Sequence, residues 1–219
     1  MKIVIDFDDT IFDTYMFVQE IIEHFKRVGF TSDEFREIYR KSKEKMKDFD
    51  QKVVVDLFFQ LKPFDKEEVV SEIDSLIERS EEFVYPDFKK FANERLRKEL
   101  ILLSFGSTDF QKRKIDNANI GNFFDKVHIT DKDKVVYLEN IYRGNPEDLI
   151  VFIDDKAVEI DKVKEKFPDV VTIKMERPRG GHVKIKSEKT DYVAKNFSDV
   201  KKIIKKISEA YESSGPINI

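Results

Sequence analysis

Residues 1–14 read MKIVIDFDDTIFDT, and this stretch decides both the fold and the site. Residues 3–5 are β-branched and apolar, which predicts a fully buried strand. The strand leads directly into Asp6, Asp8 and Asp9. Carboxylates clustered at the end of a buried strand are costly through desolvation and repulsion unless a cation neutralises them. Hard oxygen ligands in this number suit Mg²⁺, so the stretch predicts a metal-assisted reaction at the carboxyl end of a central strand.

The composition narrows the class of protein. The chain has 219 residues, of which 40% are hydrophobic and 38% charged, with a net charge of −4. This length suits one domain, or one domain with an insert. The absence of cysteine rules out disulfides and thiolate zinc sites. No basic block beyond the helix-like KKIIKK at 201–206 suggests nucleic-acid binding, and no stretch is long enough to cross a membrane. We expect a soluble cytoplasmic protein, and nothing in the sequence indicates an oligomeric state.

Between residues 15 and 83 the pattern is helical throughout. Apolar residues recur at spacings of three and four, and Pro63 separates two of the expected helices. This segment predicts a small bundle of about four helices whose many Phe residues form its core. After a first helix that Gly29 ends, the expected helices span 33–47, 49–61 and 66–82.

From residue 84 onward, short apolar runs alternate with helical patterns of about ten residues. This alternation predicts βαβ units and therefore an α/β fold with a doubly wound parallel sheet. The expected strands are 100–103, 127–130, 149–153, 170–174 and 192–194, and the expected helices are 87–98, 109–118, 133–142, 156–166 and 198–211.

Polar residues follow several of these strands. Ser104 follows the second strand, a turn with Lys132 and Lys134 follows the third, and Asp154 with Asp155 follows the fourth. Strand ends meet at one edge of such a sheet, which is where sites form. A metal, a lysine, a hydroxyl and an attacking carboxylate are the groups that phosphoryl transfer requires.

Two neighbouring features have simpler interpretations. Asp13 is interpreted as the N-cap of the first helix rather than a reacting group, because Asp is common at helix starts. The segment RPRGGH at 177–182 is interpreted as a solvated turn rather than a contact for an anionic substrate, because it is rich in Gly and Pro.

The residues from Asp6 to Thr10, extended to Ile11 and Asp13, resemble the DxDxT signature of the haloacid dehalogenase (HAD) superfamily of phosphatases and phosphotransferases. Ser104 resembles the second motif of that family, and Asp154 with Asp155 its acidic fourth motif. The resemblance implies a HAD-like Rossmannoid core of residues 1–14 and 84–219. It also implies that residues 15–83 form a helical cap of the C1 type.

The resemblance further implies roles for individual residues. Asp6 is the expected nucleophile, which becomes an aspartyl-phosphate, and Asp8 the expected general acid and base. Mg²⁺ is expected on the Asp6 carboxylate, the Asp8 backbone carbonyl and Asp155, with Asp154 in or next to the ligand shell. The expected phosphate ligands are Ser104, the amides of Phe105 and Gly106, and a lysine, with Lys132 preferred over Lys134 because Tyr137 follows it at a spacing common in the family.

These roles predict a Mg²⁺-dependent phosphatase acting on a small phosphorylated metabolite. A phosphotransferase or phosphomutase of the same fold, or a catalytically silent binding protein, are the alternatives. Asp8 argues against a dehalogenase, because the resemblance implies that a dehalogenase of this family would have the same site without that second acid. Residues around Tyr15, Met16 and Gln19 are expected to face the site and select the substrate. Asp9 replaces the usual Gly of the signature, and Glu159 and Asp161 follow the fourth motif.

Overall fold

The computed structural model describes residues 1–45, 51–94, 98–144 and 148–214. A six-stranded sheet of order β3-β2-β1-β4-β5-β6, parallel at every pairing, forms its centre. The strands are β1 Lys2–Ile5, β2 Glu99–Phe105, β3 Lys126–Thr130, β4 Ile150–Asp154, β5 Val171–Met175 and β6 Tyr192–Ala194. This is the α/β doubly wound sheet that the sequence predicts, and every expected strand is present within two residues of its predicted bounds.

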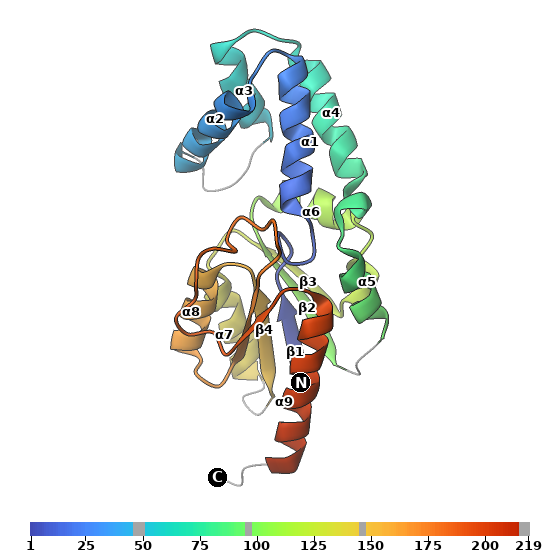
Figure 1. Ribbon diagram of the computed structural model, residues 1–219, viewed down its shortest axis with the longest axis vertical. Helices are drawn as coiled ribbons and strands as arrows, with labels where there is room; N and C mark the ends of the chain where they lie inside the picture. Colours follow the sequence, from blue (N-terminus) through green and yellow to red (C-terminus); the bar gives the residue numbers. More distant parts are fainter. Residues whose placement is uncertain (46–50, 95–97, 145–147, 215–219) are drawn as a thin grey trace.

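Two layers of helices cover the sheet (Figure 1). Successive residues of a strand point to opposite faces, so Ile3 and Ile5 pack on one side and Val4 on the other. Helices α7 Lys134–Gly144 and α8 Ala157–Lys166 cover the face of Val4. On the opposite face lie α5 Pro86–Asn93, α6 Thr108–Asn117 and α9 Phe197–Ser214.

Four helices between β1 and β2 lie beyond the carboxyl ends of the strands (Figure 1). They are α1 Thr14–Arg27, α2 Ser32–Lys45, α3 Gln51–Leu61 and α4 Lys66–Glu78. A 3₁₀ turn, Ser80–Phe83, follows α4, and a second one, Gly121–Phe123, lies between α6 and β3. Buried aromatic residues hold the helices together, as predicted: the ring of Phe25 lies 4.2 Å from that of Phe58 and 5.2 Å from that of Phe35.

Some expected helix bounds differ from those observed. The helix expected over 66–82 ends at Glu78, because the chain tightens into a 3₁₀ turn at Ser80. Pro86 begins α5, since proline at the first helical position loses no hydrogen bond. The predicted boundaries at 47 and 49 lie outside the described residues, and the helix expected over 87–98 ends at Asn93. None of the helices in the described segments is long and apolar enough to cross a membrane.

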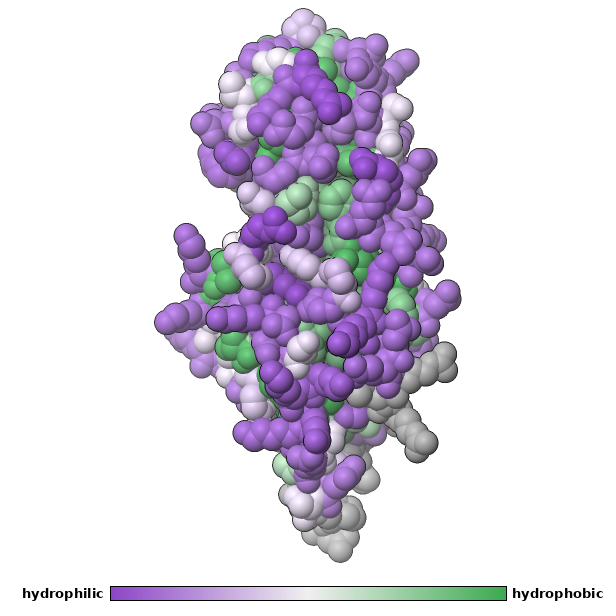
Figure 2. All heavy atoms as spheres, turned by 45° about the vertical axis from the view of Figure 1, so that its right-hand side comes forward, coloured by the Kyte–Doolittle hydropathy of each residue, from purple (hydrophilic) through white to green (hydrophobic). Residues whose placement is uncertain are grey.

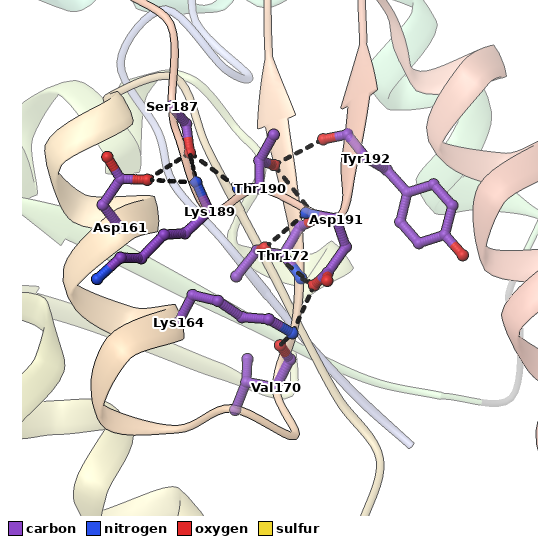
Figure 3. Close-up of polar contacts among 9 residues, drawn as sticks. All are labelled: Asp161, Lys164, Val170, Thr172, Ser187, Lys189, Thr190, Asp191 and Tyr192. Carbon is purple, nitrogen blue, oxygen red and sulfur yellow. Dashed lines mark hydrogen bonds and ion pairs between the residues drawn. The ribbon is translucent and has the colours of Figure 1, made fainter.

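The long connection between β5 and β6 is pinned at its far end by a polar network (Figure 3). Asp161 of α8 accepts hydrogen bonds from the Ser187 hydroxyl and the Lys189 backbone N–H. Asp191 accepts from the backbone N–H of Thr172 at 2.8 Å and from Lys164 at the same distance. The connection is therefore fastened to both α8 and β5 before it reaches β6.

Candidate active site

Three carboxylates meet where β1 and β4 end. The Asp6 N–H donates to the Ile153 carbonyl at 2.9 Å, so the hydrogen bonding between β1 and β4 continues one residue beyond the end of β1. Asp6, Asp154 and Asp155 are therefore brought together, with one oxygen of each within 4.8 Å of the others. All three residues are buried, as the predicted grouping of strand ends requires.

A buried lysine neutralises part of this charge. The Lys134 ammonium contacts Asp6 Oδ1 and lies 2.6 Å from Asp154 Oδ2, and its side chain is 1% exposed. Lys132, the preferred candidate from the sequence, is exposed in the turn before α7, where its backbone N–H donates to the Thr130 hydroxyl at 3.0 Å. Tyr137, whose spacing favoured Lys132, packs on His128 with ring centroids 4.1 Å apart. Lys134 is the lysine that contacts the carboxylates, because it is the first residue of α7 and its side chain extends to the ends of β1 and β4.

Burial and mutual repulsion disfavour the ionised forms of two of these acids. Burial raises the pKa of Asp6 to about 7, although the Lys134 ammonium opposes the change. Burial, followed by the negative charges of Asp6 and Asp154, raises the pKa of Asp155 to about 9. Without a further cation, ionising all three carboxyl groups of Asp6, Asp154 and Asp155 requires a large free energy.

The donor set fits a divalent cation bound at Asp155. Asp155 Oδ1 is buried and has no hydrogen-bond partner among the described residues. Both oxygens of Asp154 are already engaged, by Lys134 at 2.6 Å and by the Lys156 N–H at 2.9 Å. Oxygen ligands of this kind suit Mg²⁺. The geometry therefore favours Asp155 over Asp154 as a direct ligand beside Asp6.

Asp8 is held by donors from two helices. The Thr14 hydroxyl donates to Oδ1 at 2.8 Å, Gln111 Nε2 to Oδ2 at 2.5 Å, and Lys114 Nζ to Oδ1 at 2.5 Å. Burial alone would raise the pKa of Asp8, but the charge of Lys114 and these hydrogen bonds lower it to about 2. Asp8 is therefore ionised in this arrangement and directed towards α6.

The end of β2 supplies a hydroxyl but not the full set of expected amides. Ser104 is buried, and its hydroxyl has no partner among the described residues. The Gly106 N–H donates to the Thr130 carbonyl at 3.0 Å, so the structure does not bring this expected amide to a phosphate position. Gly106 has φ +147°, and a Cβ there would lie 2.9 Å from Gln111 Cγ, so glycine keeps Gln111 close to Asp8. Phe105 lines the cavity next to the site.

The segment 177–182 is a turn in which Pro178, Arg179 and Gly181 are exposed, as its composition indicates, but Arg177 is buried. Arg177 is 4% exposed and donates twice to the Thr10 carbonyl, at 3.1 and 2.9 Å, and once to Asp87 at 2.8 Å. The Gly181 N–H donates to Asp9 at 3.0 Å. Asp9 has φ +53°, in the left-handed region that Asp tolerates better than most residues, which explains its place where the family has Gly. The segment therefore clasps the loop that follows β1.

Asp13 caps α1, as predicted, by accepting from the Met16 N–H at 3.0 Å. It also pairs with Arg179 at 3.0 Å. The first turn of α1 is thus fixed to the segment 177–182.

A cavity of about 360 Å³ opens between this site and the helices α1 and α2. On α1 its lining comes from Thr14, Phe17, Val18 and Ile21, which share one helical face. The expected residues Tyr15, Met16 and Gln19 lie on other faces, and Tyr15 is 43% exposed. Hydrophobic side chains also gather on the outer surface at the waist where the helices meet the sheet layer (Figure 2).

Sequence reasoning missed Gln111, Lys114 and Lys156. The residues 111, 114, 115 and 118 form a helical stripe that is buried throughout. A lysine and a glutamine on an otherwise apolar stripe are a signal of a buried charge partner, and this signal was available in the sequence. Lys156 lines the cavity directly after the fourth motif, and the negative charge of Asp6 helps to raise its pKa against burial.

Comparisons with known proteins identify the family and agree with the fold. The family model for haloacid dehalogenase-like hydrolases matches residues 3–161. A putative haloacid dehalogenase-like hydrolase from Burkholderia xenovorans is similar in structure, with a TM-score of 0.71, 19% identity, and 91% of this chain and 96% of that chain covered. L-2-haloacid dehalogenase from Xanthobacter autotrophicus has a TM-score of 0.66 at 15% identity, covering 93% and 98%.

The putative HAD-hydrolase YfnB from Bacillus subtilis, described as bound to magnesium, has a TM-score of 0.64 at 15% identity, covering 93% and 97%. At these identities the solved structures support the fold alone. No curated protein matched the chain.

Proposed function

Because the chain belongs to the haloacid dehalogenase-like hydrolases, we propose that it hydrolyses a small phosphate monoester through an aspartyl-phosphate on Asp6. The observation that carries this proposal is the site around Asp6, where a buried lysine and an unpartnered Asp155 oxygen adjoin the nucleophile. Such a site is built to hold an anion and a divalent cation together. In the family, dehalogenases share the fold, so the choice of phosphate rests on the residues of this chain.

Asp8 favours a phosphate ester over a carbon–halogen bond. A departing alkoxide needs a proton, whereas a departing halide needs none. In the proposed reaction, Asp6 attacks phosphorus and Asp8 protonates the leaving oxygen. Asp8 then takes a proton from the water that opens the aspartyl-phosphate. The ion pair with Lys114 keeps Asp8 ionised, which suits the second step. Before the first step this pair must lengthen and Asp8 must take up a proton from solvent water, which it then gives to the leaving oxygen.

Other residues of the chain bind and orient the phosphoryl group. The Ser104 hydroxyl and the Lys134 and Lys156 ammonium groups are the proposed ligands of its oxygens. Bound Mg²⁺, held by the carboxylates of Asp6 and Asp155 and by the Asp8 carbonyl, would neutralise phosphoryl charge. Asp154 holds Lys134 in place.

We also propose that α1–α4, within residues 15–83, act as a cap that excludes water from the cavity between them and the sheet. The proposed setting is the cytoplasm, with a small phosphorylated metabolite as partner and no nucleic acid or membrane. Phosphotransfer to another hydroxyl and silent binding remain alternatives that no specific contact favours.

The test is phosphate release from p-nitrophenyl phosphate, with Mg²⁺ and with EDTA, by the wild type and Asp6→Asn. Turnover should need Mg²⁺ and vanish in the variant. A parallel assay of halide release from 2-chloropropionate distinguishes a dehalogenase from a phosphatase. Halide release without phosphate release, or equal phosphate release by Asp6→Asn, would overturn the proposal.

A further inference from the structure

The cavity above the site has one polar end and one apolar wall. Its polar end lies by the loops that follow β1, β2 and β4 and is lined by Asp8, Asp9, Ser107, Asp155 and Lys156, with His182 from the connection between β5 and β6. Its wall is formed by side chains of α1, α2 and α6. The apolar members of this wall are Phe17, Val18, Ile21, Phe35 and Phe110.

Among the described residues, three polar side chains that these helices send into the cavity are directed at Asp8, although the Oε1 of one of them, Gln111, has no partner there. Thr14, Gln111 and Lys114 all donate to the Asp8 carboxylate, at distances of 2.5 to 2.8 Å. They therefore serve the reacting end of the cavity. Tyr39 of α2 adds one hydroxyl to this largely hydrophobic surface.

The size of the cavity limits the ligand. A volume of about 360 Å³ lies near the lower end of the range for small-molecule sites, roughly 300–1,000 Å³. It can take a phosphoryl group and a leaving group of about one ring.

From this wall we propose that the alcohol released from the phosphate ester is apolar, an alkyl or aryl alcohol of about one ring, rather than a sugar or polyol. The inference rests on the proposed phosphatase function. A sugar would bring several hydroxyls against Phe17, Ile21 and Phe35, which supply no hydrogen bonds. Each hydroxyl buried without a partner weakens binding by roughly tenfold. A hydrocarbon ring gains affinity from the same surfaces.

The test uses two esters of the same shape and the same type of leaving group. Cyclohexylmethyl phosphate and glucose 6-phosphate both join a six-membered ring to a primary alkyl phosphate, and they differ chiefly in the ring hydroxyls. We expect kcat/KM of the Mg²⁺-loaded wild type to be at least about 100-fold higher for the cyclohexylmethyl ester. Calorimetry with the non-hydrolysable phosphonate analogues of both measures binding without turnover, and we expect the same order.

A matched pair of variants tests the wall itself. Val18→Thr places a hydroxyl in the cavity at almost constant volume and should narrow the ratio severalfold. Val28→Thr makes the same change at the far end of α1, away from the cavity, and should leave the ratio unchanged.

The outcomes separate this inference from the proposed function. Hydrolysis of both esters with equal or higher kcat/KM for glucose 6-phosphate would leave the phosphatase standing and overturn the inference. Tighter binding of the apolar analogue without hydrolysis of any monoester would overturn the phosphatase and support the apolar pocket. Binding of neither analogue, or an equal effect of Val28→Thr, would overturn the inference.

Discussion

Replacing Lys134 by Met removes the ammonium group from between two buried carboxylates. The Lys134 side chain is 1% exposed and contacts both Asp6 and Asp154. Methionine keeps much of the length of the side chain, so the loss is mainly electrostatic. Removing one partner of a buried ion pair typically costs about 3–5 kcal/mol of unfolding free energy.

The pH sets a ceiling on this cost, because a carboxyl group that has lost its partner can take up a proton. The ordinary pKa of an Asp carboxyl is 3.8, about three units below pH 7. Each unit corresponds to about 1.36 kcal/mol, so protonating one carboxyl costs about 4 kcal/mol at pH 7 and only about 1.6 kcal/mol at pH 5. The destabilisation of Lys134→Met should therefore shrink by more than half between pH 7 and pH 5.

Urea unfolding in EDTA at both pH values measures this cost, with Lys132→Met as the matched control. Lys132 is exposed, so its replacement should change the unfolding free energy by less than about 0.5 kcal/mol. A cost below about 1 kcal/mol for Lys134→Met at pH 7, the same cost at both pH values, or an equal effect of Lys132→Met would refute the reasoning. In the phosphatase assay only Lys134→Met should lose turnover.

Three further predictions concern the same region. Because the pKa of Asp155 is raised to about 9, the folded metal-free protein holds more protons than the unfolded chain between about pH 4 and 9. The contribution of the Asp155 carboxyl to the unfolding free energy should therefore fall as pH rises. The increase in Tm on adding Mg²⁺ should then be larger at pH 8.5 than at pH 6, and an equal increase at both pH values would contradict this. Lys114→Met removes the cation that holds the pKa of Asp8 at about 2, so a ¹³C NMR titration of that carboxyl should give a value above 4, and an unchanged value would show that the hydrogen bonds suffice. Arg177→Met leaves buried acceptors unpaired and should cost about 3 kcal/mol in urea unfolding, whereas Arg179→Met, 54% exposed, should cost less than 1 kcal/mol; equal costs would show that segment 177–182 is not a buried clasp.

Most of the fold can be predicted from the sequence, because each helix and strand has a local sequence pattern. The continuous apolar run of Ile3, Val4 and Ile5, all fully buried, and the helical spacing of the Phe residues are both visible without coordinates. The strand ends are equally visible, since Asp6, Ser104 and Asp154 each follow an apolar run. A parallel sheet then places these ends at one edge.

What the sequence could not show is the direction of side chains in turns and loops. Lys132 and Lys134 stand two residues apart, and only the start of α7 decides which one points at Asp6. The burial of Arg177 depends on a carbonyl 167 positions away in the chain, which no local pattern encodes. The Gly106 amide was likewise expected at the phosphate, but pairing with β3 uses it.

The clasp between Arg177 and Thr10 also fixes the order in which the site can form during synthesis. The central strand β1 is the first to leave the ribosome, yet its neighbours β2 and β4 begin only at Glu99 and Ile150. The family-defining residues 3–161 are complete before Arg177 is added. At about 5–20 residues per second, a nascent chain would carry Asp6, Lys134 and Asp155 for roughly a second or more before Arg177 binds the loop after β1. The loop after β1 is thus completed by a part of the chain that lies beyond the residues matched by the family model.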